Sequence, residues 1–376
     1  MGQKLVLLRL LAPIEMLNNM TEIAVIGGGA AGFFAAISCK NHHPESSVTI
    51  YEKFDKLLSK VKVSGGGRCN VTNACFSISQ LVKNYPRGEK QLKKIFTQFN
   101  TNDTVQWFEN RGVQLKTEAD GRMFPVTNNS QTIINCLMQE AHKLGVSIQL
   151  QQPIFAIEKE ANNFKLTLKD KIIYPNKIII ATGGSPKLEG FNWLIKLGHI
   201  IEHPVPSLFT FNMPHESITA LMGVAVNPVA VRVQGTKFKN EGALLITHWG
   251  ISGPAILKLS AWGARTLSEL NYKFIISINW LGVFTEDETN KILINEIETH
   301  PKRKICNENP FALPNRLWLF LLSKLEINPE IILGELGKKN LNRLLNALLY
   351  HYFLYFSPIY CSIVTCFGIN YWTNSY

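Results

Sequence analysis

A glycine-rich turn near the start of the chain limits the possible folds more than any other feature. The apolar run 23–26 is followed at once by the sequence GGGAAG at 27–32, and residues 30–40 then have a helix-forming pattern. A second apolar run covers 48–51. A strand, a tight turn, a helix and a strand in this order open a parallel sheet with helical crossovers. We therefore expect an α/β fold.

The same turn fits G-x-G-x-x-G, the fingerprint of a dinucleotide site. The first glycine permits the bend, the second lets a pyrophosphate approach the backbone, and the third lets the helix pack on the sheet. The helix start offers free N–H groups and a positive dipole end to phosphate. Glu52 ends the second strand, where a carboxylate accepts hydrogen bonds from a ribose diol and disfavours NADP. The alternative is a glycine turn that binds nothing.

A second glycine run, SGGGRCNVTN at 64–73, is a less common pattern. Its three glycines expose backbone N–H groups, while Arg68, Asn70, Thr72 and Asn73 add polar side chains. Such a set is able to grip phosphate or the edge of a flavin. A flexible surface loop is the other interpretation, and we favour a cofactor-binding role.

The rest of the chain changes character at about residue 190. Before it, apolar spacing predicts a helix over 133–144, ended by Gly145, and strands at 146–150, 164–168 and 177–181. After it, short strands are predicted at 229–233, 243–246 and 273–278, with a helix at 254–262 and a mostly helical stretch at 286–347. This change suggests a second, β-rich domain.

Composition limits the compartment and the partners. The seven cysteines include no Cys-x-x-Cys pair, which disfavours a disulfide framework and a zinc site, so we predict no metal and a reducing, cytoplasmic environment. A composition of 46% hydrophobic and 18% charged residues is globular and excludes a disordered chain. The net charge of +11 permits a polyanionic partner without requiring one.

Seven sequence blocks together resemble the HI0933-like family of NAD(P)/FAD-dependent oxidoreductases, a group of bacterial flavoproteins. The blocks are IAVIGGGAAG at 23–32, YEK at 51–53, KVSGGGRCNVTN at 62–73, DGRMFPVTNNS at 120–130, IIIATGGSPK at 178–187, KLGHIIEHPVPSL at 196–208 and LITHWGISGPAIL at 245–257. They follow the order of the family and cover about residues 20–345.

The resemblance implies a Rossmann-like FAD-binding domain over 20–190 and an inserted β-rich domain, a small barrel with helices, over 191–345. It also implies a set of cofactor-binding residues along the two glycine runs, the strand ends and the ATGG turn at 181–184. These are Gly27, Gly29, Ala30, Ala31, Gly32, Glu52, Lys53, Ser64, Gly65, Gly66, Gly67, Arg68, Cys69, Asn70, Thr72, Asn73, Ile154, Ala181, Thr182, Gly183 and Gly184. Plain turn glycines are an alternative for Gly183 and Gly184.

Catalytic residues are hard to identify from sequence in a flavoprotein, because the flavin carries the redox chemistry. His248 is the best acid–base candidate, since its ordinary pKa lies near neutrality and Trp249 is next to it. Packing between domains is the alternative role for His248. Cys69 is more typical of a buried apolar residue than of a redox partner. Arg122 and Phe124 would either face the flavin or pin a loop.

The two ends of the chain depart from the family pattern. Residues 1–19 resemble a weak signal peptide or an ordinary extension, and Met20 is a candidate natural start. No Asp, Glu, Lys or Arg follows Arg343, and residues 346–376 form an apolar, aromatic tail. This tail replaces the Gly-rich segment with which the family returns to the FAD domain. We expect a truncated or frameshifted relative with weak FAD binding or none, and a membrane anchor is a competing interpretation.

The leading functional hypothesis is an FAD-dependent oxidoreductase that acts on a small molecule. NAD(P)H is the candidate electron donor and would dock transiently, because no second G-x-G-x-x-G motif is present. The alternatives are a non-catalytic or RNA-associated flavin-binding protein, suggested by the basic segment 301–304, and an inactive relative. Nucleic acid and membrane are disfavoured as partners, and the oligomeric state is open.

Overall fold

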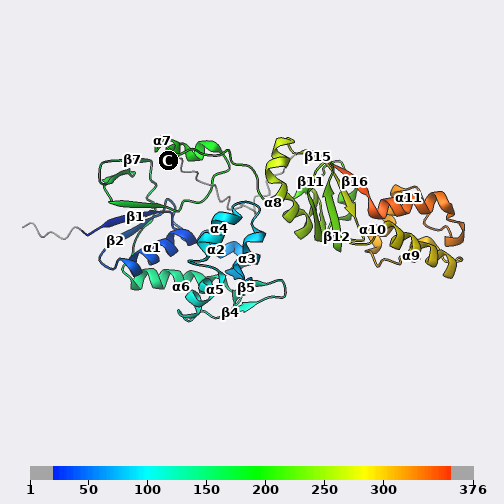
Figure 1. Ribbon diagram of the computed structural model, residues 1–376, viewed down its shortest axis with the longest axis horizontal. Coiled ribbons are helices and arrows are strands. Elements are labelled where there is room, and N and C mark those ends of the chain that lie inside the picture. The colour runs from blue at the N-terminus through cyan, green and yellow to red at the C-terminus, as the bar shows by residue number, and fades with distance from the viewer. Residues whose placement is uncertain (1–19, 357–376) are drawn as a thin grey trace, which may run out of the picture. The chain divides into compact units, whose positions relative to one another are not determined.

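The computed structural model describes residues 20–356, which form two compact units (Figure 1). The first unit ends at Glu202 and the second begins at His203, so the boundary lies later than residue 190, where the sequence predicted it. The predicted extension 1–19 and the predicted tail beyond Phe356 lie outside the described residues. No helix between residues 20 and 356 is long and apolar enough to cross a lipid bilayer.

The first unit is built on a four-stranded parallel sheet in the order β10-β1-β2-β6. Successive residues of β1 alternate between two cores: Ile23 and Val25 pack with α1 and α6, whereas Ala24 and Ile26 pack with the small sheet β7-β8-β9. Both faces of the sheet are therefore covered, as the continuous apolar run predicts. The elements are β1 (Glu22–Ile26), α1 (Ala30–His42), β2 (Ser47–Tyr51), β6 (Ser147–Gln149) and β10 (Lys177–Ile180).

The other elements of the first unit surround this sheet. The predicted helix over 133–144 is confirmed as α6, whose N-cap Asn129 accepts the N–H of Gln131 at 2.9 Å. These elements are α2 (Ser59–Val63), β3 (Thr72–Asn73), α3 (Ile78–Leu81), α4 (Glu89–Phe96), α5 (Thr101–Glu109), β4 (Leu115–Thr117), β5 (Arg122–Pro125), α6 (Ser130–Lys143), β7 (Ala156–Lys159), β8 (Phe164–Thr167), β9 (Ile172–Ile173) and α7 (Asn192–Lys196).

The second unit holds an antiparallel sheet of six strands in the order β11-β14-β13-β12-β15-β16. The sheet curls enough for the rings of Phe211 on β11 and Tyr355 on β16 to lie 5.1 Å apart. No ladder joins these two end strands within the described residues, so the predicted small barrel is not confirmed. The elements are β11 (Phe211–Asn212), β12 (Ala225–Val233), β13 (Lys239–Thr247), β14 (Gly250–Ser252), α8 (Pro254–Glu269), β15 (Lys273–Asn279) and β16 (His351–Phe356).

Three helices, α9 (Glu286–Thr299), α10 (Asn315–Lys324) and α11 (Gly337–Leu349), complete the core of the second unit. A capping box starts α9, because Thr285 accepts the N–H of Glu288 while Glu288 accepts the N–H of Thr285. The first residues of the predicted tail are part of this unit. Residues 346–349 end α11, and 351–356 form β16, which pairs with β15.

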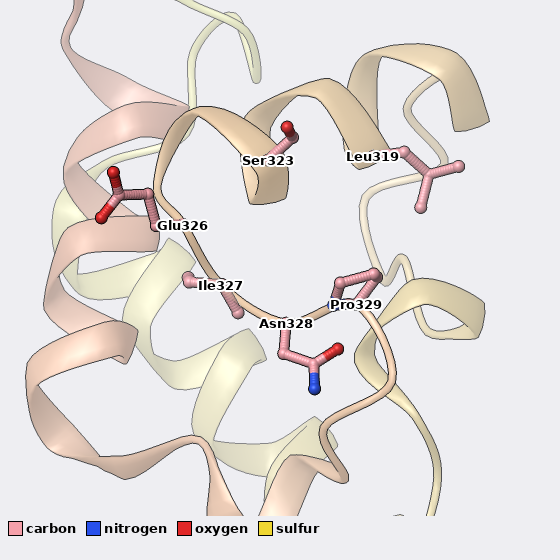
Figure 2. A pocket seen from close by; sticks show the side chains of 6 residues that line it. All are labelled: Leu319, Ser323, Glu326, Ile327, Asn328 and Pro329. Carbon is pink, nitrogen blue, oxygen red and sulfur yellow. The ribbon is translucent and has the colours of Figure 1, made fainter.

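A hollow lined mostly by apolar atoms lies in the second unit. It measures about 500 Å³ and lies beside α10, where Leu319, Ile327 and Pro329 supply apolar atoms (Figure 2). Glu326 is the charged residue among its six lining side chains. A phosphate-bearing cofactor does not fit such a lining, so the dinucleotide site has to be sought at the glycine turns of the first unit.

Candidate dinucleotide site

The carboxyl ends of three parallel strands bring the predicted cofactor residues together. Gly27 follows β1, Glu52 follows β2 and Ala181 follows β10. The N–H of Gly27 donates to the carbonyl of Tyr51 at 2.8 Å, and the N–H of Ala181 donates to that of Ile26 at 2.8 Å. This edge of an open α/β sheet is where such folds bind ligands.

Gly27 is required by its backbone and by its surroundings. Its φ of +115° is one that residues with side chains rarely adopt, and an added Cβ would lie 2.5 Å from the carbonyl oxygen of Ala181. A Cβ on Gly32 would collide with the carbonyl oxygen of Gly27. The turn is therefore closed around these two glycines, as the fingerprint predicts.

Gly29 lies on the open side of the same turn. A Cβ on Gly29 would meet no atom within 4 Å, although its φ of −88° is one that any residue adopts. Gly29 is the N-cap of α1, no side chain caps the helix, and its first turn contains no acidic residue. The N–H groups of Ala30, Ala31 and Gly32 are thus available to an anion. An open cradle at a helix start fits the pyrophosphate of a dinucleotide.

Glu52 braces the turn with both carboxylate oxygens. Oε2 accepts the N–H of Gly28 at 2.7 Å, and Oε1 accepts the N–H of Phe54 at 3.0 Å. A carboxylate has about four lone-pair positions, so each oxygen keeps capacity for a ribose hydroxyl. The amide of Gly28 is a functional group that the sequence analysis missed. The Nζ of the neighbouring Lys53 lies 4.7 Å from the ring centre of Phe54. This contact does not test the predicted role of Lys53 in cofactor binding.

The ATGG turn runs beside the first glycine turn. Thr182, Gly183 and Gly184 are exposed, and Gly183 has a φ of +77°. The side chain of Lys60 lies near Gly183, since an added Cβ there would be 3.8 Å from its Nζ. Ile154, predicted to border the adenine, follows β6 and packs partly buried against the core that contains Ala24 and Ile26.

The second glycine run forms a tight turn at Ser64–Gly67. Gly65, Gly66 and Gly67 all have positive φ angles, of 57°, 69° and 85°, which explains why three glycines occur here. A Cβ on Gly65 would lie 2.8 Å from the ring of Phe124, whereas Gly66 and Gly67 face open space. Cys69 is buried, and its burial raises the pKa of the thiol. A raised thiol pKa agrees with a packing role rather than a redox role.

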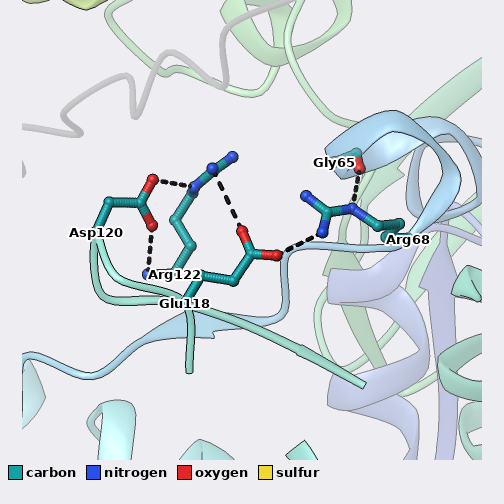
Figure 3. A network of polar contacts seen from close by, with 5 residues as sticks. All are labelled: Gly65, Arg68, Glu118, Asp120 and Arg122. Carbon is teal, nitrogen blue, oxygen red and sulfur yellow. Dashed lines mark hydrogen bonds and ion pairs between the residues drawn. The ribbon is translucent and has the colours of Figure 1, made fainter. Parts of the chain in front are cut away.

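Arg68 is engaged by protein groups rather than directed only at a ligand. Its Nη1 forms an ion pair with Oε1 of Glu118 at 2.5 Å (Figure 3). Its guanidinium lies 4.0 Å from the ring centre of Phe124. Arg122 lies 5.5 Å from the same ring centre and pairs with Asp120 at 2.7 Å and with Glu118 at 3.4 Å. The two arginines and the buried Phe124 therefore pin the glycine loop to the β4-β5 hairpin. Glu118 is a partner that no sequence motif indicated.

The polar residues after Arg68 also hold the loop. Thr72 pairs with Met123 in the β3-β5 ladder, and the side-chain oxygen of Asn73 accepts the N–H of Cys75 at 3.0 Å. The backbone nitrogen of Asn70 lies 2.9 Å from the position of a Cβ on Gly65. The open backbone of Gly66 and Gly67 is thus the part of this loop that fits a cofactor best.

His248 lies in the exposed turn between β13 and β14 in the second unit. Its ring contacts that of Trp249 edge to face, with centres 4.3 Å apart. The indole Nε1 of Trp249 is buried and has no hydrogen-bond partner within the described residues. The exposed position leaves the imidazole of His248 accessible, and its catalytic role stays a prediction.

One group of side chains has the composition of a metal site, which the sequence analysis did not predict. The potential ligand atoms of Glu296, His300 and Glu308 lie within 4.8 Å of one another. Each group already has a protein partner, since His300 Nδ1 lies 2.6 Å from Glu296 Oε1 and Arg303 bonds Glu308 at 2.9 Å. These contacts account for the cluster without an ion.

Three relatives of the chain have names that describe reductive or modifying enzymes. The chain is 29% identical to the ribosomal RNA dihydrouridine synthase of Escherichia coli over 337 residues, which are 87% of this chain and 79% of that protein. It is 28% identical to the enzyme of the same name from Haemophilus influenzae, over 67% of this chain and 64% of that protein. It is 25% identical to the 3-dehydro-bile acid delta(4,6)-reductase of Clostridium scindens, over 66% of this chain and 62% of that protein.

The chain spans less than two thirds of the length of the last two relatives. A family model also matches the chain over most of its length. Residues 21–300 match the family described as the HI0933-like protein Rossmann domain, a span that includes both glycine runs, Glu52 and the ATGG turn. The chain therefore belongs to the HI0933-like family, as its motifs predict.

Proposed function

We propose that this protein is an FAD-dependent reductase of a carbon–carbon double bond next to a carbonyl group, and that its substrate is uridine in ribosomal RNA. The observation that supports FAD binding is the open space at Gly29. It lies at the uncapped start of α1, next to Gly28, whose N–H donates to the Glu52 carboxylate. The names of the relatives support the reaction class, because a dihydrouridine synthase and a delta(4,6)-reductase both saturate a carbon–carbon double bond.

In this proposal the residues of the chain bind and orient the cofactor and the substrate, and the flavin, once reduced by NAD(P)H, would supply the hydride. The N–H groups of Ala30, Ala31 and Gly32 would hold the pyrophosphate, and Glu52 would accept hydrogen bonds from the ribose. Saturation of the bond also needs one proton. We assign its delivery to His248, because its side chain is exposed and imidazole is a common general acid in enzymes.

The first experiment measures cofactor binding and turnover separately. The purified chain should show flavin absorbance after incubation with FAD, and ribosomal RNA treated with the protein and NADPH or NADH should gain dihydrouridine, seen by mass spectrometry of nucleosides. Gly29→Val should abolish flavin binding, because it fills the cradle, while leaving the melting temperature of the flavin-free protein unchanged. Failure of the unsubstituted chain to bind FAD would refute the proposal.

A second candidate substrate is a small cyclic enone, which the similarity to the delta(4,6)-reductase favours. The flavin-loaded protein can be reduced first and then mixed with either substrate. Reoxidation by a steroid dienone but not by RNA would select this candidate. Stopped-flow reduction with NADH and NADPH identifies the donor, and no reduction by either would remove the nicotinamide-linked form of the proposal.

A further inference from the structure

Helix α4 presents a cluster of exposed lysines. Lys90, Lys93 and Lys94 are all exposed, and their i, i+3, i+4 spacing places them on one face of the helix. None of the three forms an ion pair with another residue between 20 and 356. We call these three residues the α4 lysine face.

The opposite side of α4 attaches it to the first unit. The ring of Phe96 lies 5.7 Å from that of Tyr85, and the ring of Phe99, just after the helix, lies 5.2 Å from that of Phe34 on α1. Phe34 is on the same helix whose start forms the open phosphate cradle. The lysine face thus belongs to the same compact body as the dinucleotide site.

The basic segment 301–304, which the sequence associates with RNA, has most of its positive charge paired with carboxylates. Arg303 pairs with Glu308 at 2.9 Å, and Lys304 pairs with Glu330 at 2.5 Å. Two of its three cations are therefore already neutralised by neighbouring carboxylates. By contrast, the three lysines of α4 have no such partner among the described residues, and the helix contains one acidic residue, Glu89, at its start.

We propose that the α4 lysine face docks the phosphate backbone of an RNA. Phosphate backbones attract lysines that project from one surface, and release of their counterions drives binding. This inference rests on the proposed function, since it supplies the surface by which an RNA substrate would be held. Charge complementarity favours RNA, and an anionic membrane is the competing partner, because a basic amphipathic helix also suits a lipid surface. Phe96 and Phe99 contact the rings of Tyr85 and Phe34, although Phe99 is still 37% exposed. Within α4 itself Ile95 is the exposed large apolar residue, which is little apolar surface for a helix that lies in lipid.

The test compares two triple variants of the full chain with equal loss of charge. One is Lys90→Gln, Lys93→Gln, Lys94→Gln. The control replaces three exposed lysines of the β7-β8-β9 sheet and its turns, Lys159, Lys169 and Lys171, also with Gln. Binding of a fluorescein-labelled, uridine-containing RNA hairpin is measured by anisotropy over a range of salt concentrations, without reductant.

We expect the α4 variant to bind the hairpin on the order of 10- to 100-fold more weakly near 0.15 M salt, and its salt slope to fall by about 2 to 3. The control variant should keep both the affinity and the slope. Equal losses in the two variants would show that only net charge matters and would overturn the inference. Unchanged binding in the α4 variant would do so as well.

Two further measurements separate this inference from its competitors. Cosedimentation with phosphatidylserine vesicles that depends on the α4 lysines, with no change in RNA binding, would assign the face to a membrane and overturn the inference. RNA that binds through α4 without gaining dihydrouridine would sink the proposed function but keep the docking surface. Dihydrouridine formation in the α4 variant with an unchanged KM for RNA would overturn the docking surface but keep the proposed function.

Discussion

Protonation of a buried histidine should make the second unit lose stability in mild acid. His351 on β16 is 7% exposed, and its Nδ1 accepts a hydrogen bond from the indole Nε1 of Trp280 at 3.1 Å. The bond requires an unprotonated Nδ1, so a charged imidazole would break it. Burial first, and then the positive charge of Lys324, lower the pKa of His351 from 6.5 to about 3.

The size and direction of the effect follow from these two pKa values. The unfolded chain binds the proton near pH 6.5, whereas the folded chain resists it down to about pH 3. Stability is therefore fully present above the unfolded pKa and is lost as the pH falls from about 6.5 toward 3. The full difference corresponds to roughly 5 kcal/mol, of which about 2 kcal/mol is lost by pH 5.

Urea unfolding of wild type and His351→Gln at about pH 7.5 and pH 5 measures this loss. Glutamine keeps an acceptor for Trp280 but does not titrate, so its free energy of unfolding should change about 2 kcal/mol less between the two pH values. His215→Gln, at an exposed histidine of the same unit, should retain the wild-type change. An equal pH dependence in wild type and His351→Gln would refute the reasoning.

Three other predictions concern the glycine loop, a helix start and the proton donor. Phe124→Ala should lower the free energy of unfolding by about 3–5 kcal/mol in urea titrations, because it empties a fully buried ring position; a loss below about 1 kcal/mol would contradict the packing role. Thr285→Ala should cost about 1 kcal/mol through loss of the α9 capping box, whereas a Thr285→Ser control should stay close to wild type. His248→Gln should slow reduction of the substrate by about 100-fold or more while flavin binding stays intact, and an unchanged rate would exclude it as the acid.

The parallel sheet could be predicted from sequence because its signals are local. The run at 23–26 is apolar at every position, the glycine turn follows directly, and α6 has its apolar residues at helical spacing. The strand ends then bring Gly27, Glu52 and Ala181 together without further information. Each of these features depends on residues within one or two neighbouring elements.

The role of Arg68 could not be predicted, because its partner Glu118 is far along the chain and lies outside the DGRMFPVTNNS block of the same hairpin. The start of the aromatic tail is a different case. In β16, His351, Phe353 and Tyr355 are buried while Tyr352 and Leu354 are exposed. Alternating burial is typical of a strand. The sequence does not show it, because the exposed positions are also apolar or aromatic and the segment therefore looks like one continuous apolar run.

The brace formed by Glu52 also affects how tightly a ribose could bind. Both carboxylate oxygens are already held by backbone amides, those of Gly28 and Phe54. A hydroxyl that arrives there meets a rotamer that needs no further ordering, so little conformational entropy is lost on association. Preorganisation of this kind links folding to affinity. A substitution that removes these two backbone hydrogen bonds would lower the affinity for the ligand, even where the side chain at position 52 still accepts hydrogen bonds from the ribose.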